Sequence, residues 1–299
     1  MPVTLQFSLG QALKEGMARL NAASVPSSAL SAELLLIHAT GRDRTWLYAH
    51  PEEALDNSLV EKYLAMIARR ASGEPTQYIV GKQEFWGLEF EVTPAVLIPR
   101  PETEHLIEVA LERIGAARRT EGLRIADVGT GSGCIAVALA QELPNVQITA
   151  TDISSAALEV ARRNVARHEM TDRIQLVQAD LLAFDFHESR AKSQQPRLFD
   201  LILSNPPYIA TGEAPELQRE VRDHEPAQAL FAGPAGSEIY ERLIEQAWPA
   251  LKPGGILAME LGYGLAEPVG KMFDPARWSH LSTSNDLAGL SRVIAAERM

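Results

Sequence analysis

The first quarter of the chain, residues 1–73, has the periodicity of helices. Apolar residues recur at helical intervals in two stretches, which are Leu30, Leu34, Leu35 and Ile37, and then Leu59, Tyr63, Met66 and Ile67. Gly41 is expected to end the first of these two helices. The spacing of a capping box also occurs twice, in Ser8 with Gln11 and in Ser58 with Glu61. The pattern predicts a small helical domain.

The pattern changes after Gly73 and Pro75. The runs Tyr78–Val80 and Leu88–Val92 are rich in apolar and β-branched residues and are separated by glycines, so we expect them to form a hairpin. A helix is expected to follow from about Thr103 to Ala116. The hairpin would then link the helical domain to the rest of the chain.

From residue 123 onward, β-rich runs alternate with helical ones. The expected strands are Leu123–Val128, Val146–Thr151, Ile174–Gln178, Phe199–Ser204 and Ile256–Glu260. Helices are expected from Cys134 to Ala140, from near Ser154 or Ser155, and from Glu238 to Leu251. The tail from Trp278 to Ala296 supplies two more strands, paired antiparallel at the edge. The alternation predicts an α/β fold with a mainly parallel sheet covered by helices on both faces.

Two segments lack clear periodicity. His187–Arg197 is polar and irregular, and we expect a surface loop there. Ile209–Ser237 is longer, and loops of that length are usually functional lids or disordered. We expect this segment to cover the active site or grip a substrate, with His224 as a surface or hydrogen-bonding histidine and not a base.

A glycine-rich turn follows the first strand of the α/β region. Gly129-Thr130-Gly131-Ser132-Gly133 lies between a strand and a helix, and such a turn lets the backbone approach a ligand closely. The pyrophosphate fingerprint of nicotinamide cofactors would need glycine at position 134, where Cys134 stands. A GxGxG turn suits S-adenosyl-L-methionine, which carries an adenosyl group and an amino acid end but no pyrophosphate.

Acidic residues end the next two strands. Asp152 follows the second strand, 23 residues after Gly129, where it can accept hydrogen bonds from both ribose hydroxyls. Asp180 follows the third strand, where it can meet the exocyclic amine of adenine. Taken alone, Asp152 is equally explained as the cap of the next helix. The succession of strand ends favours the binding role.

The fourth strand ends in Asn205-Pro206-Pro207-Tyr208. Proline cannot continue a central strand, and its fixed φ stiffens the corner. The Asn205 amide oxygen, the Pro206 carbonyl and the Tyr208 ring then form a rigid clamp for a planar NH2 group. That geometry suits methylation of an amide or aromatic amine nitrogen, with Asn205, Pro206 and Tyr208 as the catalytic residues.

Charge and composition narrow the class of protein. The 299 residues contain 28 Lys plus Arg against 39 Asp plus Glu, a formal charge of −11, which disfavours duplex DNA as a standing partner. One cysteine excludes an intramolecular disulfide, and no Cys and His cluster has metal-ligand spacing, so we expect no metal. We expect no signal peptide, and the longest apolar runs are too short for a bilayer. These features predict a cytoplasmic enzyme without a membrane partner.

Several further motifs carry a family resemblance. They are Pro75-Thr76-Gln77-Tyr78-Ile79, Phe85-Trp86-Gly87, Leu97-Ile98-Pro99-Arg100-Pro101-Glu102-Thr103-Glu104, and Glu225-Pro226 with Ala229-Leu230. With the glycine turn and the Asn-Pro-Pro-Tyr corner, nearly the whole chain resembles the PrmC/HemK family of Rossmann-like methyltransferases. Those enzymes methylate the glutamine of the Gly-Gly-Gln motif in class I peptide chain release factors. The resemblance implies a helical substrate-recognition domain at 1–74, a β-hairpin linker at 75–99 and a methyltransferase domain at 100–299 with a seven-stranded sheet.

The resemblance also implies roles for individual residues. The cofactor site would consist of Gly129, Thr130, Gly131, Ser132, Gly133, Asp152, Asp180, Leu181 and Asn205. Relatives can carry a tryptophan after the acid, and Leu181 keeps apolar contact with adenine but loses ring stacking. The substrate glutamine would be held by Asn205, Pro206, Pro207 and Tyr208. Two prolines hold Arg100 in extended backbone, and we expect it to line the cleft and contact the substrate.

Two other functions remain open from the sequence. An adenine-specific nucleic-acid methyltransferase would use the same clamp on a flipped base. It would be expected to show a basic face, whereas residues 1–95 contain 8 Lys plus Arg and 11 Asp plus Glu. A non-catalytic cofactor-binding protein is the second alternative, and the intact corner beside an intact glycine turn disfavours it. We expect a monomer whose protein substrate is a class I release factor, with no stably bound nucleic acid and S-adenosyl-L-homocysteine as the product of the cofactor.

Overall fold

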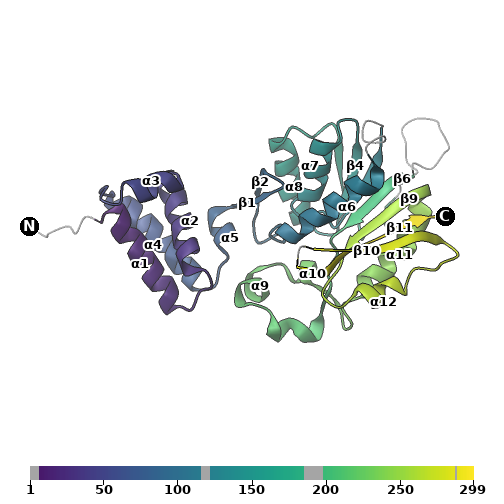
Figure 1. Cartoon of the computed structure of the whole chain (residues 1–299). Coiled ribbons are helices and arrows are strands. Elements are labelled where there is room, and N and C mark those ends of the chain that lie inside the picture. Colours follow the sequence, from purple (N-terminus) through teal and green to yellow (C-terminus); the bar gives the residue numbers. More distant parts are fainter. Residues whose placement is uncertain (1–6, 116–121, 185–197, 287) are drawn as a thin grey trace, which may run out of the picture. The chain divides into compact units, whose positions relative to one another are not determined.

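The computed structural model describes residues 7–115, 122–184, 198–286 and 288–299, and these divide into two compact units. The first unit runs to Lys82 and includes Gln218–His224. The second unit consists of Gln83–Leu217 and Glu225–Met299. Figure 1 shows the elements of both units along the chain.

The described part of the first unit is helical. Its helices are α1 (Leu9–Ala22), α2 (Ser28–Thr40), α3 (Arg44–Ala49), α4 (Asn57–Ala71), α5 (Thr76–Val80) and α9 (Arg219–His224). The capping box of α1 is confirmed, since Ser8 Oγ accepts from Gln11 N–H at 3.3 Å and Gln11 Oε1 accepts from Ser8 N–H at 2.9 Å. Gly41 ends α2 in the left-handed conformation, as expected.

Two local predictions for this unit were wrong. Helix α4 begins one residue earlier than the proposed Ser58 cap, because the Asp56 carboxylate accepts from Ser58 N–H at 2.9 Å and caps the helix instead. Tyr78–Val80 is helical and not a strand. Pro75 precedes this short helix, and Gly81 at φ +80° ends it by donating to the Gln77 carbonyl. Apolar content alone cannot distinguish a short buried strand from a helical turn.

The second unit is built on one large sheet. In the described residues its strand order is β10-β11-β9-β6-β3-β4-β5. The strands are β3 (Arg124–Val128), β4 (Gln147–Asp152), β5 (Ile174–Gln178), β6 (Phe199–Ser204), β9 (Leu251–Glu260), β10 (Trp278–Asn285) and β11 (Ser291–Arg298). The first five pair in parallel, and β11 pairs antiparallel with both β9 and β10, which confirms the predicted edge.

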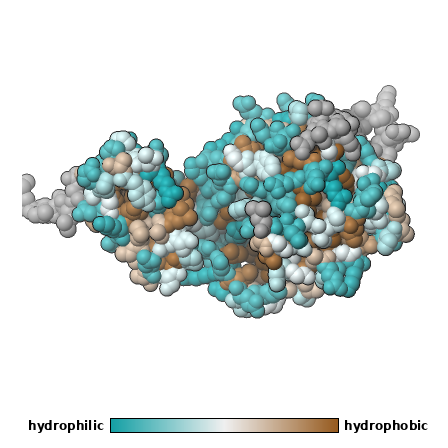
Figure 2. All heavy atoms as spheres, in the orientation of Figure 1, coloured by the Kyte–Doolittle hydropathy of each residue, from teal (hydrophilic) through white to brown (hydrophobic). Residues whose placement is uncertain are grey.

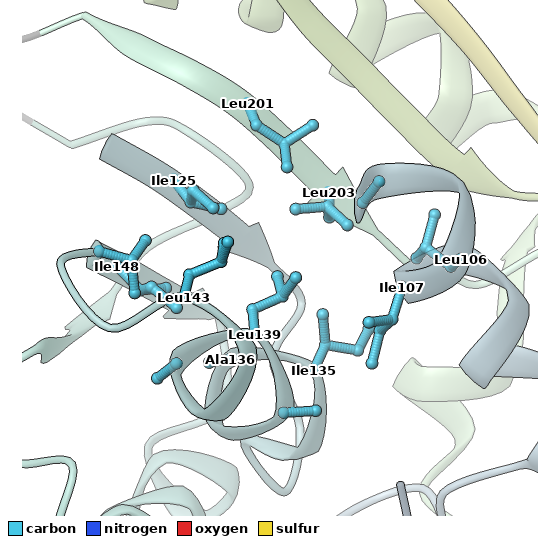
Figure 3. Packing of buried hydrophobic residues seen from close by; sticks show 14 of the residues in the cluster. Leu106, Ile107, Ile125, Ile135, Ala136, Leu139, Leu143, Ile148, Leu201 and Leu203 are labelled. Carbon is cyan, nitrogen blue, oxygen red and sulfur yellow. The ribbon is translucent and has the colours of Figure 1, made fainter. Parts of the chain in front are cut away.

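Helices cover both faces of this sheet. They are α6 (Glu104–Ile114), preceded by the 3-10 turn η1 (Pro101–Thr103), then α7 (Cys134–Glu142), α8 (Ser155–Arg167), α11 (Glu238–Ala250) and α12 (Ala266–Gly270). Alternate strand residues bury themselves on opposite faces. Leu201 and Leu203 pack with α6 and α7, as Figure 3 shows, whereas Ile202 packs with α11.

The remaining elements of the second unit are short. They are the hairpin strands β1 (Lys82–Phe85), whose first residue is the last of the first unit, and β2 (Leu88–Glu91), then β7 (Ile209–Ala210), η3 (Thr211–Glu216), α10 (Ala227–Leu230) and β8 (Phe231–Gly233). The segment Ile209–Ser237 is therefore more ordered than its weak periodicity suggested, since β7 and β8 pair in parallel across it. The expected loop His187–Arg197 lies outside the described residues. Helix α6 ends at Ile114, two residues before the predicted end at Ala116, because Gly115 at φ +73° caps it.

The face drawn in Figure 2 carries both hydrophilic and hydrophobic residues. Figure 2 shows apolar residues gathered over α2, where Leu30 and Leu34 are 48% and 39% exposed. Of the helices described, none is both long and apolar enough to cross a membrane.

Candidate active site

The glycine turn is hydrogen-bonded to the neighbouring strand. Gly129 and Gly131 have φ of +73° and +55°, which side chains with a Cβ rarely adopt. A Cβ at either glycine would meet no atom within 4 Å. The N–H groups of Gly129 and Thr130 both donate to the Thr151 carbonyl, at 2.9 and 2.8 Å. The turn is thus fixed to β4, and its outer side is open to a ligand.

Asp152 at the end of β4 braces the same turn. Its Oδ2 accepts from Gly131 N–H and its Oδ1 from Ser154 N–H, both at 2.9 Å. Burial raises the pKa of Asp152 above its ordinary value, and the backbone N–H donors oppose the shift. Asp152 is not the N-cap of α8, because the Ser154 side chain holds that position and accepts from Ala157 N–H. Asp152 also faces a cavity.

A pocket of about 310 Å³ lies at the carboxyl ends of the strands. Its lining is Ala95, Val96, Leu97, Gly129, Gly131, Asp152, Ile153, Ala157, Ala179, Asp180, Leu181, Asn205, Pro207, Pro226, Gln228, Ala229, Phe231, Ile239 and Arg242. Seven of the residues predicted from the sequence are among them. The six that are not in this lining are Arg100, Thr130, Ser132, Gly133, Pro206 and Tyr208.

Residues that follow β5 form another part of the pocket lining. Asp180 forms an ion pair with Arg242, with Oδ2 2.6 Å from Nη2, and both side chains are about half exposed. Leu181 has φ of +56°, and its carbonyl accepts from Thr151 Oγ1 at 2.9 Å. Gly133, in contrast, does not face the pocket. A Cβ at Gly133 would lie 3.4 Å from Ala161 Cβ on α8, which is an ordinary contact, and the φ of +82° is what favours glycine there.

The Asn205–Tyr208 corner touches two cavities. Asn205 and Pro207 line the first pocket, and Tyr208 lines a second one of about 420 Å³. The second pocket is bounded by Tyr208, Ile209, Ala210, Glu213, Glu216, Leu217, Ala235, Gly262, Tyr263 and Leu265. Two molecules, one bound in each pocket, would therefore both contact this corner.

Specific contacts hold the corner residues in place. Asn205 Nδ2 donates to Thr103 Oγ1 at 3.0 Å, which leaves the Asn205 Oδ1 as the acceptor of that side chain. The Tyr208 ring lies against Gly262, where a Cβ would come within 2.7 Å of the ring. Burial raises the pKa of the Tyr208 phenol to about 12, so this phenol stays neutral and cannot act as a base near neutral pH.

Arg100 has a partner that the sequence did not reveal. Its Nη2 lies 2.6 Å from Oε1 of Glu225, whose side chain is only 1% exposed. The two residues flank stretches that line the first pocket, Ala95–Leu97 and Pro226–Phe231. The pair joins these stretches, and a direct contact of Arg100 with a substrate stays a prediction.

Sequence reasoning also missed three polar residues beside the corner and the turn. Asp127 is fully buried in β3, where its Oδ2 accepts from Thr130 Oγ1 at 2.6 Å and from Ala136 N–H at 3.2 Å. Burial raises the pKa of Asp127 to about 7. Thr103 and Glu260 are buried near Asn205. An acid inside or at the end of an apolar strand was the available signal for Asp127 and Glu260.

Family models match both units. One described as PrmC N-terminal domain matches residues 11–81, and one described as Methyltransferase small domain matches residues 108–222. The chain is 45% identical to the release factor glutamine methyltransferase of Koribacter versatilis (strain Ellin345), over 98% of this chain and 99% of that protein. It is 41% identical to the release factor glutamine methyltransferase of Nitratidesulfovibrio vulgaris, over 99% of this chain and 97% of that protein.

A solved structure shares the fold at lower identity. The hMettl16 catalytic domain in complex with the MAT2A 3'UTR hairpin 6 has a TM-score of 0.55 at 18% identity, covering 77% of this chain and 81% of that chain. This likeness concerns the fold alone, and it confirms the predicted Rossmann-like methyltransferase architecture. The full-length relatives settle the family. The chain belongs to the release factor glutamine methyltransferases.

Proposed function

We propose that the protein methylates the side-chain amide nitrogen of the glutamine in the Gly-Gly-Gln motif of class I peptide chain release factors, using S-adenosyl-L-methionine. The observation that carries this proposal is the position of the Asn205–Tyr208 corner, which contributes residues to two pockets. One pocket would hold the methyl donor and the other the acceptor side chain. The names of the full-length relatives supply the acceptor.

The first pocket suits the proposed cofactor. Gly129 and Gly131 present an open backbone surface, because a Cβ at either position would point into free space. Asp152 offers carboxylate oxygens for the ribose hydroxyls, and Asp180 with Leu181 would face the adenine. When bound, S-adenosyl-L-methionine supplies an electrophilic methyl group on a sulfonium ion and leaves as S-adenosyl-L-homocysteine.

The corner residues would orient and polarise the acceptor amide. Its nitrogen is a poor nucleophile, because the lone pair is delocalised into the carbonyl. The Asn205 Oδ1 and the Pro206 carbonyl would accept its two N–H bonds and aim the nitrogen, and such positioning contributes up to roughly 7–11 kcal/mol in favourable systems. The same acceptors stabilise the positive charge that develops on nitrogen. Pro207 keeps the corner rigid, and Tyr208 would stack on the planar amide.

Removal of the proton from the acceptor nitrogen does not require a base. The nitrogen becomes acidic once it carries the methyl group, so its proton can leave to solvent after the N–C bond has formed. The neutral Tyr208 phenol is consistent with a stacking role. This scheme needs neither His224 nor a metal.

The helical unit would recognise the protein substrate. The exposed Leu30 and Leu34 on α2 support this role, since exposed apolar groups often mark interaction sites. We place the enzyme in the cytoplasm as a monomer, with residues 1–74, 75–99 and 100–299 as its recognition domain, linker and methyltransferase domain.

Transfer of labelled methyl groups tests the proposal. Purified enzyme and labelled S-adenosyl-L-methionine would be incubated with a release factor, with the same factor carrying alanine for the Gly-Gly-Gln glutamine, and with unmethylated DNA. Label on the parent factor alone is expected. Asn205→Ala should abolish turnover with cofactor affinity retained, and label on DNA or on the alanine factor would refute the proposed acceptor.

A further inference from the structure

The ends of two neighbouring strands bring an amide and an acid together. β6 and β9 lie side by side and pair in parallel (Figure 1), with Ser204 opposite Met259. Asn205 and Glu260 are the next residues after this pair. Alternation places Leu203 and Ala258 on the face that α6 covers. Asn205 and Glu260, two positions further on, fall on the same face. The residue just before α6 is Thr103.

Thr103 lies between the two side chains. Its hydroxyl oxygen accepts from Asn205 Nδ2 at 3.0 Å, and its side chain is a hydrogen-bond donor to the Glu260 carboxylate. Thr103 and Glu260 are 3% and 2% exposed, so water competes little for these groups. One Glu260 oxygen, Oε2, is buried without a hydrogen-bond partner among the described residues.

The direction of these hydrogen bonds follows from the chemistry of the three groups. A hydroxyl has one hydrogen to donate, and an ionised carboxylate can only accept. Glu260 therefore takes the Thr103 hydrogen, which leaves the Thr103 oxygen as an acceptor. The Asn205 amide must then turn its NH2 end to Thr103, and its oxygen is left for the reaction.

We propose that Glu260 and Thr103 are positioning residues that set which end of the Asn205 side chain faces the acceptor amide. This inference rests on the proposed glutamine methylation. The wrong end would present N–H donors to a substrate NH2 group, so that donors face donors. Neither residue needs to touch the substrate, because both act through Asn205.

The charge state of Glu260 controls this arrangement. Burial raises the pKa of Glu260 to about 7, while the Thr103 hydrogen bond lowers it. The other titratable or charged groups that act on Glu260 are Arg292 on β11, Glu102 on η1, Arg100 beside it, Tyr208, and Tyr240 on α11. A protonated Glu260 can donate to Thr103 and reverse the chain of hydrogen bonds. Activity should therefore fall as the pH drops below about 7.

Substitutions can separate positioning from stability. Glu260→Gln keeps the size of the side chain but replaces a carboxylate, which only accepts, with an amide that can also turn N–H donors to Thr103, and Thr103→Val removes the hydroxyl. Thr103→Val should lower kcat at least about tenfold at pH 8, since loss of one aligned donor or acceptor in an active site can cost roughly 100–1,000-fold. Glu260→Gln should lower kcat by a smaller factor, because its amide oxygen can still accept from Thr103. Thr103→Ser should restore most of the activity. Cofactor affinity, measured by calorimetry, should stay within about twofold in all three, as expected for an effect confined to the reacting amide.

A matched control uses another buried acid of the same sheet. Asp200 lies at the opposite end of β6 and pairs with Lys252, with Oδ2 2.8 Å from Nζ. Asp200→Asn should keep the parent kcat and its fall at acidic pH, whereas Glu260→Gln should lose that fall. Parent kcat and pH profile in Glu260→Gln, or equal losses in kcat and cofactor affinity, would overturn the inference.

A second readout does not depend on the acceptor. The side-chain NH2 resonances of Asn205 in the full-length protein should shift with a midpoint near pH 7, and Glu260→Gln should remove that shift. Resonances that ignore pH between 6 and 8.5 in the parent would refute the inference even if release factor is methylated. A shift with no methylation of release factor would support it and reject the proposed acceptor.

Discussion

The ion pair between Arg100 and Glu225 joins two stretches that line the first pocket. The free energy of unfolding that is lost when this pair is broken can be estimated. Arg100 Nη2 lies 2.6 Å from Glu225 Oε1, with side chains 32% and 1% exposed. Removing one partner of a buried pair costs roughly 3–5 kcal/mol, because a buried charge loses its compensation. Solvent screens Arg100 in part, and Ile98 N–H still donates to Glu225 Oε2 at 3.4 Å. We therefore expect Arg100→Met to lose about 2–3 kcal/mol.

Thermal unfolding and calorimetry measure this loss. A change of that size in a domain of about 200 residues lowers Tm by roughly 4–12 °C. Cofactor affinity should fall as well, because Ala95–Leu97 and Pro226–Phe231 are no longer held together. Arg100→Met combined with Glu225→Gln should recover most of the Tm, since the uncompensated charge is gone.

The opposite result would return Arg100 to the role expected from the sequence. Arg100→Met with the parent Tm and cofactor affinity but a reduced kcat/KM for release factor would refute the ion-pair argument. It would indicate that Arg100 contacts the substrate directly.

Three other substitutions test separate parts of the site. Asp152→Ala should weaken cofactor binding by about ten- to a hundredfold, the worth of one or two hydrogen bonds, and calorimetry with unchanged affinity would remove Asp152 from the ribose role. Gly262→Ala should lower kcat more than cofactor affinity, because the new Cβ would lie 2.7 Å from the Tyr208 ring; steady-state kinetics equal to the parent would exclude a role for that contact. The pKa of Asp127 is raised to about 7 in the folded protein. Stability should therefore fall as the pH rises from about 4 to 7, by up to roughly 1.4 kcal/mol per pH unit for this group. Asp127→Asn should reduce the dependence of the unfolding free energy on pH, measured by denaturant unfolding. The contribution of Glu260 to that dependence should remain, and a dependence identical to the parent would contradict the assignment.

Local patterns were sufficient for most of the sheet and for the cofactor turn. Ile174–Gln178 and Phe199–Ser204 are strands with the bounds expected. Phe199–Ser204 is buried throughout, and its apolar centre Leu201-Ile202-Leu203 is typical of a buried parallel strand. The glycine turn and the Asn-Pro-Pro-Tyr corner are defined within five residues, so their backbone demands are visible in the sequence. The prediction of a strand at Tyr78–Val80 was wrong, because three apolar residues show too little periodicity to distinguish a strand from a helix.

The contacts that hold the site together were beyond sequence reasoning. Arg100 and Glu225 are 125 residues apart, and Asn205 and Thr103 are 102 apart. Their pairing depends on which strands become neighbours, and the order β9-β6-β3 is not a property of any one segment. A single sequence shows that Thr103 starts a helix and that Glu260 ends a strand. It does not show that the two ends meet.

The parallel arrangement explains why the polar residues meet where they do. The interiors of β3, β6 and β9 are largely buried and apolar, so polar side chains are tolerated there mainly at strand ends. Parallel strands place all their carboxyl ends at one edge, which collects Asp152, Asn205 and Glu260 from β4, β6 and β9. The outermost of these groups are left to bind ligands. Glu260, covered by the start of α6, can act only through a neighbour, and Thr103 is the neighbour that connects it to Asn205.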